Sequence, residues 1–264
     1  MTTTPLLQCR GLRKTFNAGL PGSRPALDGI DLTLERGDFV VVIGSNGAGK
    51  STLLNAIAGA VGLDDGRLVL DGTDITRMAA HRRAGAITRV FQDPMIGTAA
   101  AMTIEENLAL AEQRGKTRGL VLHLNNRKRD DYRARLATLK LGLENRLETP
   151  VAQLSGGQRQ ALSLIMAVLS QPKLLLLDEH TAALDPRTAD IVMTATLMVV
   201  AENALTALMV THNMRQAIDT GNRLVMMDAG RIRDDIGGAE KSALTAGELV
   251  EKFKIDNDRM LLGT

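Results

Sequence analysis

A glycine-rich segment beginning at Gly44 constrains the fold of this chain more than any other feature. Residues 44–51 read Gly-Ser-Asn-Gly-Ala-Gly-Lys-Ser, which fits the pattern G-x-x-x-x-G-K-[S/T] at every fixed position. The apolar run Phe39–Ile43 precedes the segment, and a helical pattern follows it from Ser51. A strand, a glycine loop and a helix in this order direct backbone N–H groups and a helix N-terminus at one point. The segment therefore predicts a phosphate-binding loop.

Lys50 and Ser51 close this segment and carry its chemistry. The ammonium of Lys50 is expected to reach the β- and γ-phosphates of a nucleotide, and the hydroxyl of Ser51 to hold Mg²⁺. The alternative is a glycine-rich turn that binds nothing. The strand before the segment and the helix after it argue against that alternative.

An apolar run over Leu174–Leu177 ends in the two acids Asp178 and Glu179. A strand that is buried on both faces carries acids only where it leaves the sheet, and α/β sheets bind ligands at the carboxyl ends of their strands. Solvated carboxylates at a strand end are the alternative, which is weakened by the phosphate loop. We therefore expect Asp178 to contact the Mg²⁺ shell and Glu179 to polarise an attacking water.

Short apolar runs recur along the chain and indicate buried strands. Helical patterns lie between several of them, which is typical of an α/β protein with a mainly parallel, buried sheet. The runs are Phe39–Ile43, Leu68–Leu70, Ile87–Phe91, Leu174–Leu177, Ala207–Thr211 and Leu224–Met227.

A charged stretch with few strand signals interrupts this alternation over about 94–154. Thr103 and Glu106 form a capping-box pattern that predicts a helix over Ile104–Gln113. A second helix is expected over Arg127–Leu141. The stretch is therefore interpreted as a helical subdomain.

The remaining sequence forms the core into which this subdomain is inserted. We expect a single domain, 1–264, with an α/β core of about 1–93 and 155–264. After Gly230 only a short strand and one helix are expected, which is too little for a further domain.

Composition excludes several classes of function. The 264 residues include 32 Lys and Arg against 30 Asp and Glu, and the net charge of +2 is too small for binding to nucleic acid by phosphate neutralisation alone. Aromatic residues make up 2%, too few for a base-stacking platform. Cys9 is the single cysteine, so an internal disulfide is excluded and a reducing compartment is expected.

Membrane-spanning and secretion signals are missing from the sequence. Uncharged apolar stretches such as 191–201 fall short of the roughly 18 residues of a spanning helix. Residues 1–5 lack the positive start and the apolar stretch of a secretory signal. Any link to a membrane is therefore expected to run through a partner.

A second helix N-terminus that can bind an anion is predicted at Ser155. Serine is a good N-cap residue, and Gly156 and Gly157 follow it. Glycine costs about 1 kcal/mol against alanine in a helix interior, so two glycines here indicate that something approaches the backbone closely. Because one nucleotide rarely needs two phosphate cradles from one chain, the second cradle is expected to serve a neighbouring molecule.

With these motifs in order, the chain resembles the ATP-binding cassette (ABC) ATPases over nearly its whole length. The resemblance implies a P-loop NTPase fold: an ABC ATPase core with a mainly parallel sheet, N-terminal antiparallel β strands and an inserted helical subdomain. It also implies a head-to-tail dimer, in which a signature motif closes over ATP held by the other subunit. The residues of that motif are Ser155, Gly156, Gly157 and Gln158.

Further roles follow from this resemblance. Gln92 is similar to the Q-loop glutamine that contacts Mg²⁺ or water, and Asp185 to the D-loop aspartate. His212 is similar to the switch histidine that senses the γ-phosphate, and Phe16 lies where the family places an aromatic that stacks on adenine. The expected catalytic residues are Glu179, His212, Gln92 and Lys50, and the expected ligands of the cofactor Mg²⁺ are Ser51, Gln92 and Asp178. The expected ATP-binding residues are Phe16, Gly44, Ser45, Asn46, Gly47, Ala48, Gly49, Lys50, Ser51 and Thr52.

Several of these residues also have a purely structural interpretation. His212 alone is more often a strand-end histidine with a backbone partner, and Gln92 alone is more often a surface amide. For Phe16 an ordinary core position is the alternative, and stacking is favoured over it. Asp185 before Pro186 is also a good N-cap with proline at the first helical position, which is compatible with the D-loop role.

Three positions depart from the pattern of the family. His180 follows Glu179 where the family mostly has proline, and Ala161 and Met166 stand where arginine is frequent. None of these positions contacts nucleotide in the family, so ATP hydrolysis is still expected. Local packing and partner contacts are expected to differ.

The resemblance implies an ATP-hydrolysing subunit of a membrane transporter. A pair of such chains would act at the cytoplasmic face of the bacterial inner membrane, bound peripherally to separate permease chains. Residues 91–98, 102–107 and 178–185 are similar to a subgroup paired with importers that use a periplasmic or lipid-anchored solute-binding protein. Permeases of that subgroup are similar to those for branched-chain amino acids, which makes amino acids or related small solutes the expected cargo.

Alternatives to this function stay open. A soluble ABC ATPase of the iron–sulfur assembly type is also a short single cassette, and an exporter cassette carries the same motifs. Repair members carry coiled coils or zinc insertions and ribosome-associated members carry two cassettes, features that this chain lacks in sequence.

Overall fold

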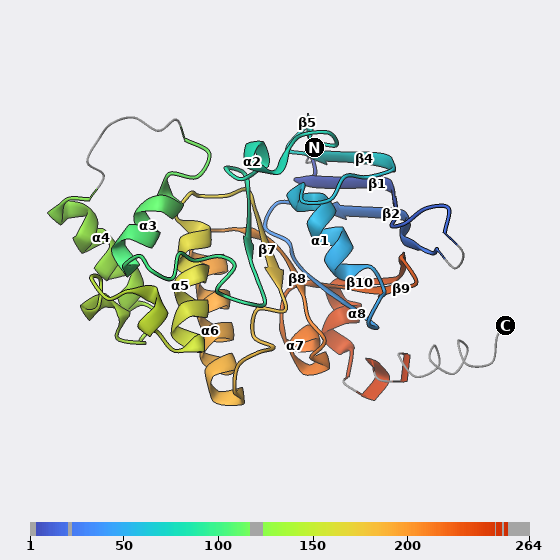
Figure 1. The fold of residues 1–264 in the computed structure, drawn as a ribbon. Coiled ribbons are helices and arrows are strands. Elements are labelled where there is room, and N and C mark those ends of the chain that lie inside the picture. The colour runs from blue at the N-terminus through green and yellow to red at the C-terminus, as the bar shows by residue number, and fades with distance from the viewer. Residues whose placement is uncertain (1–3, 21–22, 117–123, 246, 250, 253–264) are drawn as a thin grey trace.

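Two β-sheets form the framework of the computed structural model, which describes residues 4–20, 23–116, 124–245, 247–249 and 251–252 (Figure 1). The first sheet is antiparallel, with strand order β2-β1-β4-β5. Its strands are β1 (Leu7–Thr15), β2 (Pro25–Leu34), β4 (Asp65–Leu70) and β5 (Thr73–Asp74). The expected N-terminal antiparallel strands are therefore confirmed.

The second sheet has the order β10-β9-β3-β8-β7-β6 and is parallel except for the pairing of β10 with β9. Its strands are β3 (Phe39–Gly44), β6 (Ile87–Val90), β7 (Leu174–Asp178), β8 (Thr206–Val210), β9 (Arg223–Asp228) and β10 (Arg231–Gly237). The expected α/β fold with a mainly parallel sheet is confirmed. All six apolar runs form strands, and the run Leu68–Leu70 belongs to the antiparallel sheet as part of β4.

The parallel sheet carries apolar side chains on both faces, as expected for strands covered on two sides. Alternate residues of β3 divide between two clusters: Val40 and Val42 pack with the antiparallel sheet and the helix α1 (Lys50–Ala58), and Val41 and Ile43 pack on the opposite face. Because β3, β6, β7 and β8 are parallel, their carboxyl ends lie at one edge of the sheet. Residues that follow these strands are therefore brought together.

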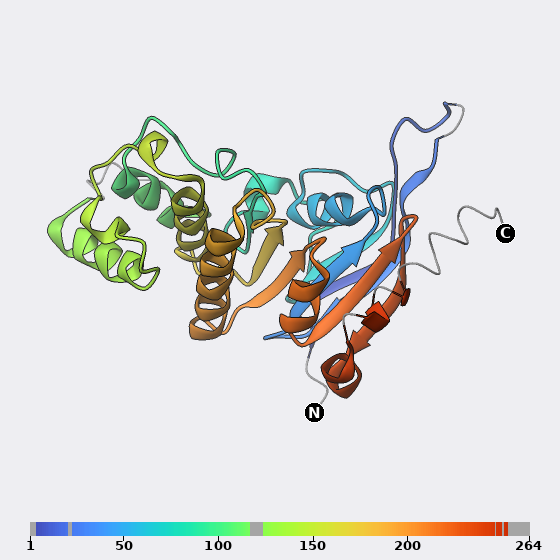
Figure 2. The ribbon, with the colours of Figure 1, turned by 90° about the horizontal axis from the view of Figure 1, so that it is seen from below.

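Four helices, among them the three longest, gather at one end of the molecule. Figures 1 and 2 both place α3 (Ile104–Glu112), α4 (Asn126–Ala137), α5 (Gly156–Val168) and α6 (Pro186–Glu202) there, away from the antiparallel sheet. Besides α1, shorter helices are α2 (Ala80–Arg83), α7 (Met214–Asp219) and α8 (Gly238–Ala243), with short 3₁₀ turns η1 (Leu143–Asn145) and η2 (Val151–Gln153).

The predicted capping box before α3 is confirmed. The backbone N–H of Glu106 donates to Thr103 Oγ1, and the N–H of Thr103 donates to the Glu106 carboxylate at 2.7 Å. The helix ends at Glu112, one residue before the expected end at Gln113. Between 94 and 154, the residues that the structure describes contain no strand, and residues 117–123 lie outside them.

The expected end of the second helix of this stretch was wrong. Helix α4 ends at Ala137 rather than at Leu141, because Lys140 adopts a φ of 54° in the left-handed region, which a helix cannot continue through. After Gly230, β10 and α8 are present as expected, and residues 247–249 and 251–252 add a further helical segment. No described helix is both long and apolar enough to cross a membrane.

Candidate functional site

The glycine-rich segment forms the turn between β3 and α1, as its pattern predicts. Gly49 is the N-cap of α1 with a φ of 98°, and a Cβ there would lie 2.2 Å from the carbonyl oxygen of Ala26. Only glycine fits this close approach and this conformation. With no side chain at the N-cap to accept from them, the first N–H groups of α1 face the loop and can bind an anion.

Lys50 is buried, with 6% of its surface exposed, and its ammonium lies inside the loop. Its Nζ donates to the carbonyl oxygens of Gly44 at 2.8 Å and Ser45 at 3.0 Å. Burial lowers the pKa of Lys50, and the carboxylates of Glu179 and Asp178 oppose that shift. The loop therefore holds a cation beside the two acids that end β7.

Asp178 is the last residue of β7, and its carboxylate is paired with the guanidinium of Arg89 on β6. Arg89 also donates from Nη1 to Asn55 Oδ1 at 2.6 Å and lies over the ring of Phe91. Arg89 was missed by sequence reasoning. A basic residue inside the apolar run Ile87–Phe91 was the available signal, because a charge in a buried strand requires a partner.

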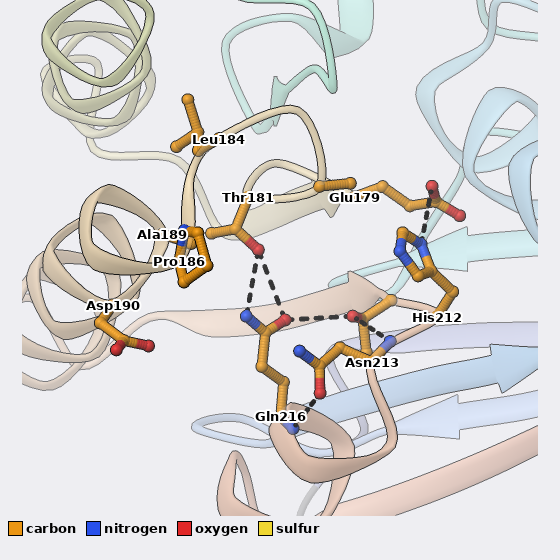
Figure 3. Close-up of a pocket in the computed structure, with 11 residues that line it drawn as sticks. Glu179, Thr181, Leu184, Pro186, Ala189, Asp190, His212, Asn213 and Gln216 are labelled. Carbon is orange, nitrogen blue, oxygen red and sulfur yellow. Dashed lines mark hydrogen bonds and ion pairs between the residues drawn. The ribbon is translucent and has the colours of Figure 1, made fainter.

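The structure places Glu179 and His212 beside each other (Figure 3). His212 Nδ1 lies 3.3 Å from Glu179 Oε2. The backbone of Glu179 has a φ of 44°, and its N–H donates to the carbonyl oxygen of Val210 at 3.0 Å. The adjacent strands β7 and β8 thus bring the acid and the imidazole together at the edge of the sheet.

Gln92 follows β6 at the same edge. It lines a cavity of about 490 Å³ together with Asp178, Arg89 and Asn55. The structure therefore brings Gln92 and Asp178 to one cavity. Their roles as Mg²⁺ ligands, and that of Ser51 at the start of α1, stay predictions.

Ser155 is the N-cap of α5, as predicted. Its Oγ accepts from the N–H of Gln158 at 3.3 Å, and its own N–H donates to Gln158 Oε1 at 3.2 Å, so the pair forms a capping box. Gly157 lies against the first turn of α6, where an added Cβ would be 2.0 Å from Thr188 Cγ2. The glycine that the sequence assigned to phosphate approach is thus also required by packing within the chain.

Asp185 is the N-cap of α6, with Pro186 at the first helical position, as expected. Its Oδ1 accepts from the N–H of Thr188 at 3.1 Å, and the hydrogen bonds to Thr188 lower the pKa of Asp185. The D-loop role of Asp185 stays a prediction. Because Thr188 contacts both Asp185 and Gly157, the signature segment and the start of α6 form one packed unit.

Phe16 follows β1 and is 47% exposed, so it is not a core residue. The ammonium of Lys14 lies 5.7 Å from the centre of its ring. An exposed ring beside a cation is available for stacking. Adenine stacking by Phe16 stays a prediction.

His180, the residue that departs from the family pattern, is 2% exposed. Its Nε2 lies 3.0 Å from Thr196 Oγ1 on α6. Burial lowers the pKa of His180 to about 4. The other two departures, Ala161 and Met166, are buried on α5. All three positions therefore affect packing.

Comparison with known proteins identifies relatives of the chain. Residues 27–182 match the family model described as ABC transporter. The chain is 44% identical to the tyrosine transport ATP-binding protein of Clostridioides difficile (strain R20291), over 94% of this chain and 99% of that protein. It is 32% identical to the spermidine/putrescine import ATP-binding protein PotA of Haemophilus influenzae (strain ATCC 51907 / DSM 11121 / KW20 / Rd), over 88% of this chain but only 58% of that protein.

Solved structures agree with these relatives. The ADP conformation of an ATP-binding cassette from an ABC transporter superposes with a TM-score of 0.76 at 27% identity, over 96% of this chain and 99% of that one. A dimeric, post-hydrolysis ATP-binding cassette bound to ADP and Pi superposes with a TM-score of 0.74 at 26% identity, over 88% of this chain and 98% of that one.

Proposed function

The chain belongs to the ABC transporter family and is an ATP hydrolase, and from this premise we propose that it energises a bacterial importer of amino acids or related small solutes. One observation carries the proposal: the similarity to the tyrosine transport ATP-binding protein extends over nearly the full length of both chains. Two copies would act at the cytoplasmic face of the inner membrane, bound to separate permease chains. A periplasmic or lipid-anchored solute-binding protein would deliver the cargo.

ATP would bind with its phosphates in the loop of residues 44–52 and its adenine on Phe16. The uncapped N–H groups of α1 and the buried ammonium of Lys50 support this placement, since both favour phosphate oxygens. Mg²⁺ would accompany ATP, held by Ser51, Gln92 and Asp178. A hydroxyl, an amide oxygen and a carboxylate are oxygen ligands of the kind that Mg²⁺ prefers, so the residues present fit the ion. When bound, the ion would neutralise charge on the phosphates.

Hydrolysis would use the pair at the sheet edge. Glu179 would orient a water and accept its proton as the water oxygen bonds to the γ-phosphorus and the bond to the β–γ bridging oxygen breaks. His212, 3.3 Å from Glu179, would hold that carboxylate and contact the γ-phosphate, while Lys50 would stabilise the developing charge. ADP and phosphate are the products.

The site would be completed by a second copy of the chain. Ser155, Gly156, Gly157 and Gln158 would close over ATP bound to the partner, with Asp185 at the same interface. Ser155 supports this role because it begins α5 from an exposed position, where the helix N-terminus can meet an anion. The dimeric arrangement of a solved relative also supports it.

The permease would bind beside Gln92. We propose that the helical subdomain of about 94–154 and the core of about 1–93 and 155–264 move relative to each other through the segment of residues 92–103. Met95 and Ile96 support a contact there, because these apolar side chains are 41% and 66% exposed beside the cavity that Gln92 lines.

Purification of the tagged chain from native membranes tests this function. A hydrophobic permease should copurify with the wild type, and Ile96→Glu should lose it without losing ATP binding, because a charge would enter an apolar contact. Leu197→Glu is the matched control, since Leu197 is an exposed apolar residue on α6. The purified complex should then show ATPase activity stimulated by an amino acid and its binding protein.

Two results would point elsewhere. Copurification of soluble scaffold proteins alone would favour the iron–sulfur assembly type. If the ATPase activity of the complex with the permease responds only to cargo added on the cytoplasmic side, an exporter would be favoured.

A further inference from the structure

The amide of Gln216 lies between the two turns that carry the proposed catalytic pair (Figure 3). Gln216 Nε2 donates to Thr181 Oγ1 at 3.2 Å, and Thr211 Oγ1 donates to Gln216 Oε1 at 3.1 Å. Thr181 belongs to the turn after Glu179, and Thr211 directly precedes His212. The side chain of Gln216 therefore connects the turn after β7 to the turn after β8.

Gln216 is itself fixed in place by the start of α7. The side chain of Asn213 caps this helix by accepting from the N–H of Gln216 at 3.1 Å, and the N–H of Asn213 donates to Thr211 Oγ1 at 3.1 Å. Thr181 and Thr211 are 7% and 5% exposed, so their hydroxyls have little access to water. A buried hydroxyl that loses its partner is destabilising, which favours keeping this arrangement closed.

The space beside the two turns is open rather than packed. A cavity of about 240 Å³ is bordered by Glu179, Thr181, Thr211, His212 and Gln216. Within a packed core, contacts on all sides fix a side chain, whereas a turn that borders a cavity lacks contacts on that side. The hydrogen bonds of Gln216 are therefore well placed to hold the two turns across this space.

The Glu179–His212 contact is sensitive to the spacing of these turns. Its length of 3.3 Å is near the upper limit of a hydrogen bond, so a shift of a few tenths of an ångström would break it. The sheet holds Glu179 by one backbone hydrogen bond to Val210, and His212 lies beyond the end of β8 with its side chain 61% exposed. The sheet also holds Thr211, whose N–H donates to the carbonyl oxygen of Val42 at 3.2 Å, but it does not hold the side chain of His212. A link between the two turns therefore adds a constraint on the Glu179–His212 distance that the sheet does not supply.

We propose that Gln216 is a positioning residue that sets the distance between Glu179 and His212 by tying together the turns that carry them. This inference rests on the proposed roles of Glu179 and His212 in hydrolysis. Gln216 does not touch the nucleotide and acts only through Thr181 and Thr211. Loss of its amide should therefore lower the rate of cleavage and leave nucleotide binding nearly unchanged.

Gln216→Met tests the proposal, because methionine keeps the length of the side chain and removes both hydrogen bonds. Misplacement of catalytic groups by about 1 Å typically costs about 10²-fold in rate, so we expect kcat to fall roughly 10- to 100-fold with KM for ATP within about twofold. Gln216→Glu should restore most of the activity, since a carboxylate can accept from the hydroxyls of both threonines. A purely structural role predicts neither this rescue nor this separation of kcat from KM.

Matched variants complete the experiment. Arg215→Met makes a similar replacement on the same helix, at a side chain that is 90% exposed, and should keep wild-type activity. Thr181→Val removes the same link from its other end and provides a second route if Gln216→Met does not fold. Combining Thr181→Val with Gln216→Met should cost no more than Gln216→Met alone, because both remove one connection.

The outcomes separate this inference from the proposed function. If Glu179→Gln is inactive while Gln216→Met and Thr181→Val both keep the wild-type kcat, the positioning role of Gln216 is overturned. Full activity of Glu179→Gln instead overturns the proposed role of the acid. A loss of kcat in Gln216→Met that Gln216→Glu does not relieve, or additive losses with Thr181→Val, also contradicts the inference.

Discussion

His180 places a titratable imidazole in the core directly after the proposed catalytic acid Glu179. Its Nε2 lies 3.0 Å from Thr196 Oγ1, and the Thr196 hydroxyl donates to the carbonyl oxygen of Val192 at 2.8 Å. The hydroxyl is therefore left to accept, which assigns the proton of a neutral imidazole to Nε2. Protonation of the second ring nitrogen would put a charge into the core, and burial accordingly lowers the pKa of His180 to about 4 from an ordinary value of 6.5.

This shift sets how stability depends on pH. Between pH 6.5 and 4 the unfolded chain binds a proton at His180 that the folded chain does not, so stability falls as the pH falls through this range. At 1.36 kcal/mol for each unit, the contribution at neutral pH is about 3 kcal/mol, and it is lost completely below about pH 4. At pH 5 the expected loss relative to pH 7.5 is about 2 kcal/mol.

Urea unfolding of the wild type and of His180→Gln between pH 7.5 and 5 measures this loss. The chain has no tryptophan, so circular dichroism is the suitable signal. Glutamine can still donate to Thr196 but does not titrate. The contributions of the other ionisable groups to the unfolding free energy cancel in the difference between the two proteins. The difference in unfolding free energy should change by about 2 kcal/mol from pH 7.5 to 5. His81→Gln is the control for an exposed imidazole, and a difference for His180→Gln that is constant with pH would refute the reasoning.

Three further predictions concern ATP. Lys50→Ala should weaken ATP binding and abolish hydrolysis, at a cost of roughly 10²–10³ or more in the rate of phosphate release, and normal activity would contradict the phosphate-loop assignment. Glu179→Gln should slow hydrolysis by roughly 10²–10⁴ and, with ATP and Mg²⁺ but not with ADP, elute as a dimer in size-exclusion chromatography. A variant that binds ATP tightly yet stays monomeric would count against the shared site. Ser155→Asp should be inactive alone but regain activity when mixed with Lys50→Ala; no recovery would place both half-sites in one chain.

Local sequence patterns predicted the parts of the fold that local chemistry determines. Apolar runs marked six strands, five of them in the mainly parallel sheet, where a strand covered on both sides needs apolar residues on both faces. The N-caps Thr103, Ser155 and Asp185 were found because each satisfies N–H groups within three residues of itself. The end of α4 was missed, because the left-handed conformation of Lys140 has no glycine to signal it.

The contacts that join distant segments could not be predicted in the same way. Arg89 meets Asp178 because β6 and β7 are neighbours in the sheet, and Gln216 meets Thr181 because α7 begins beside the turn after β7. Neither pairing has a fixed spacing in sequence. The sequence motifs therefore identified the candidate residues, and the structure identified what holds them in position.

Gly157 shows why the test of the shared site belongs at Ser155. A side chain at Gly157 would collide with Thr188, whose N–H is held by the Asp185 cap, so it would push the start of α6 and the turn after Glu179 within its own chain. If a substitution at Gly157 lowered activity, the displacement within its own chain could not be separated from an effect on the partner's ATP. Ser155 is exposed, and aspartate is as good an N-cap as serine, so Ser155→Asp keeps α5 and adds only a negative charge. Ser155→Asn keeps the cap without the charge, and the difference between these two variants therefore isolates repulsion of the partner's γ-phosphate.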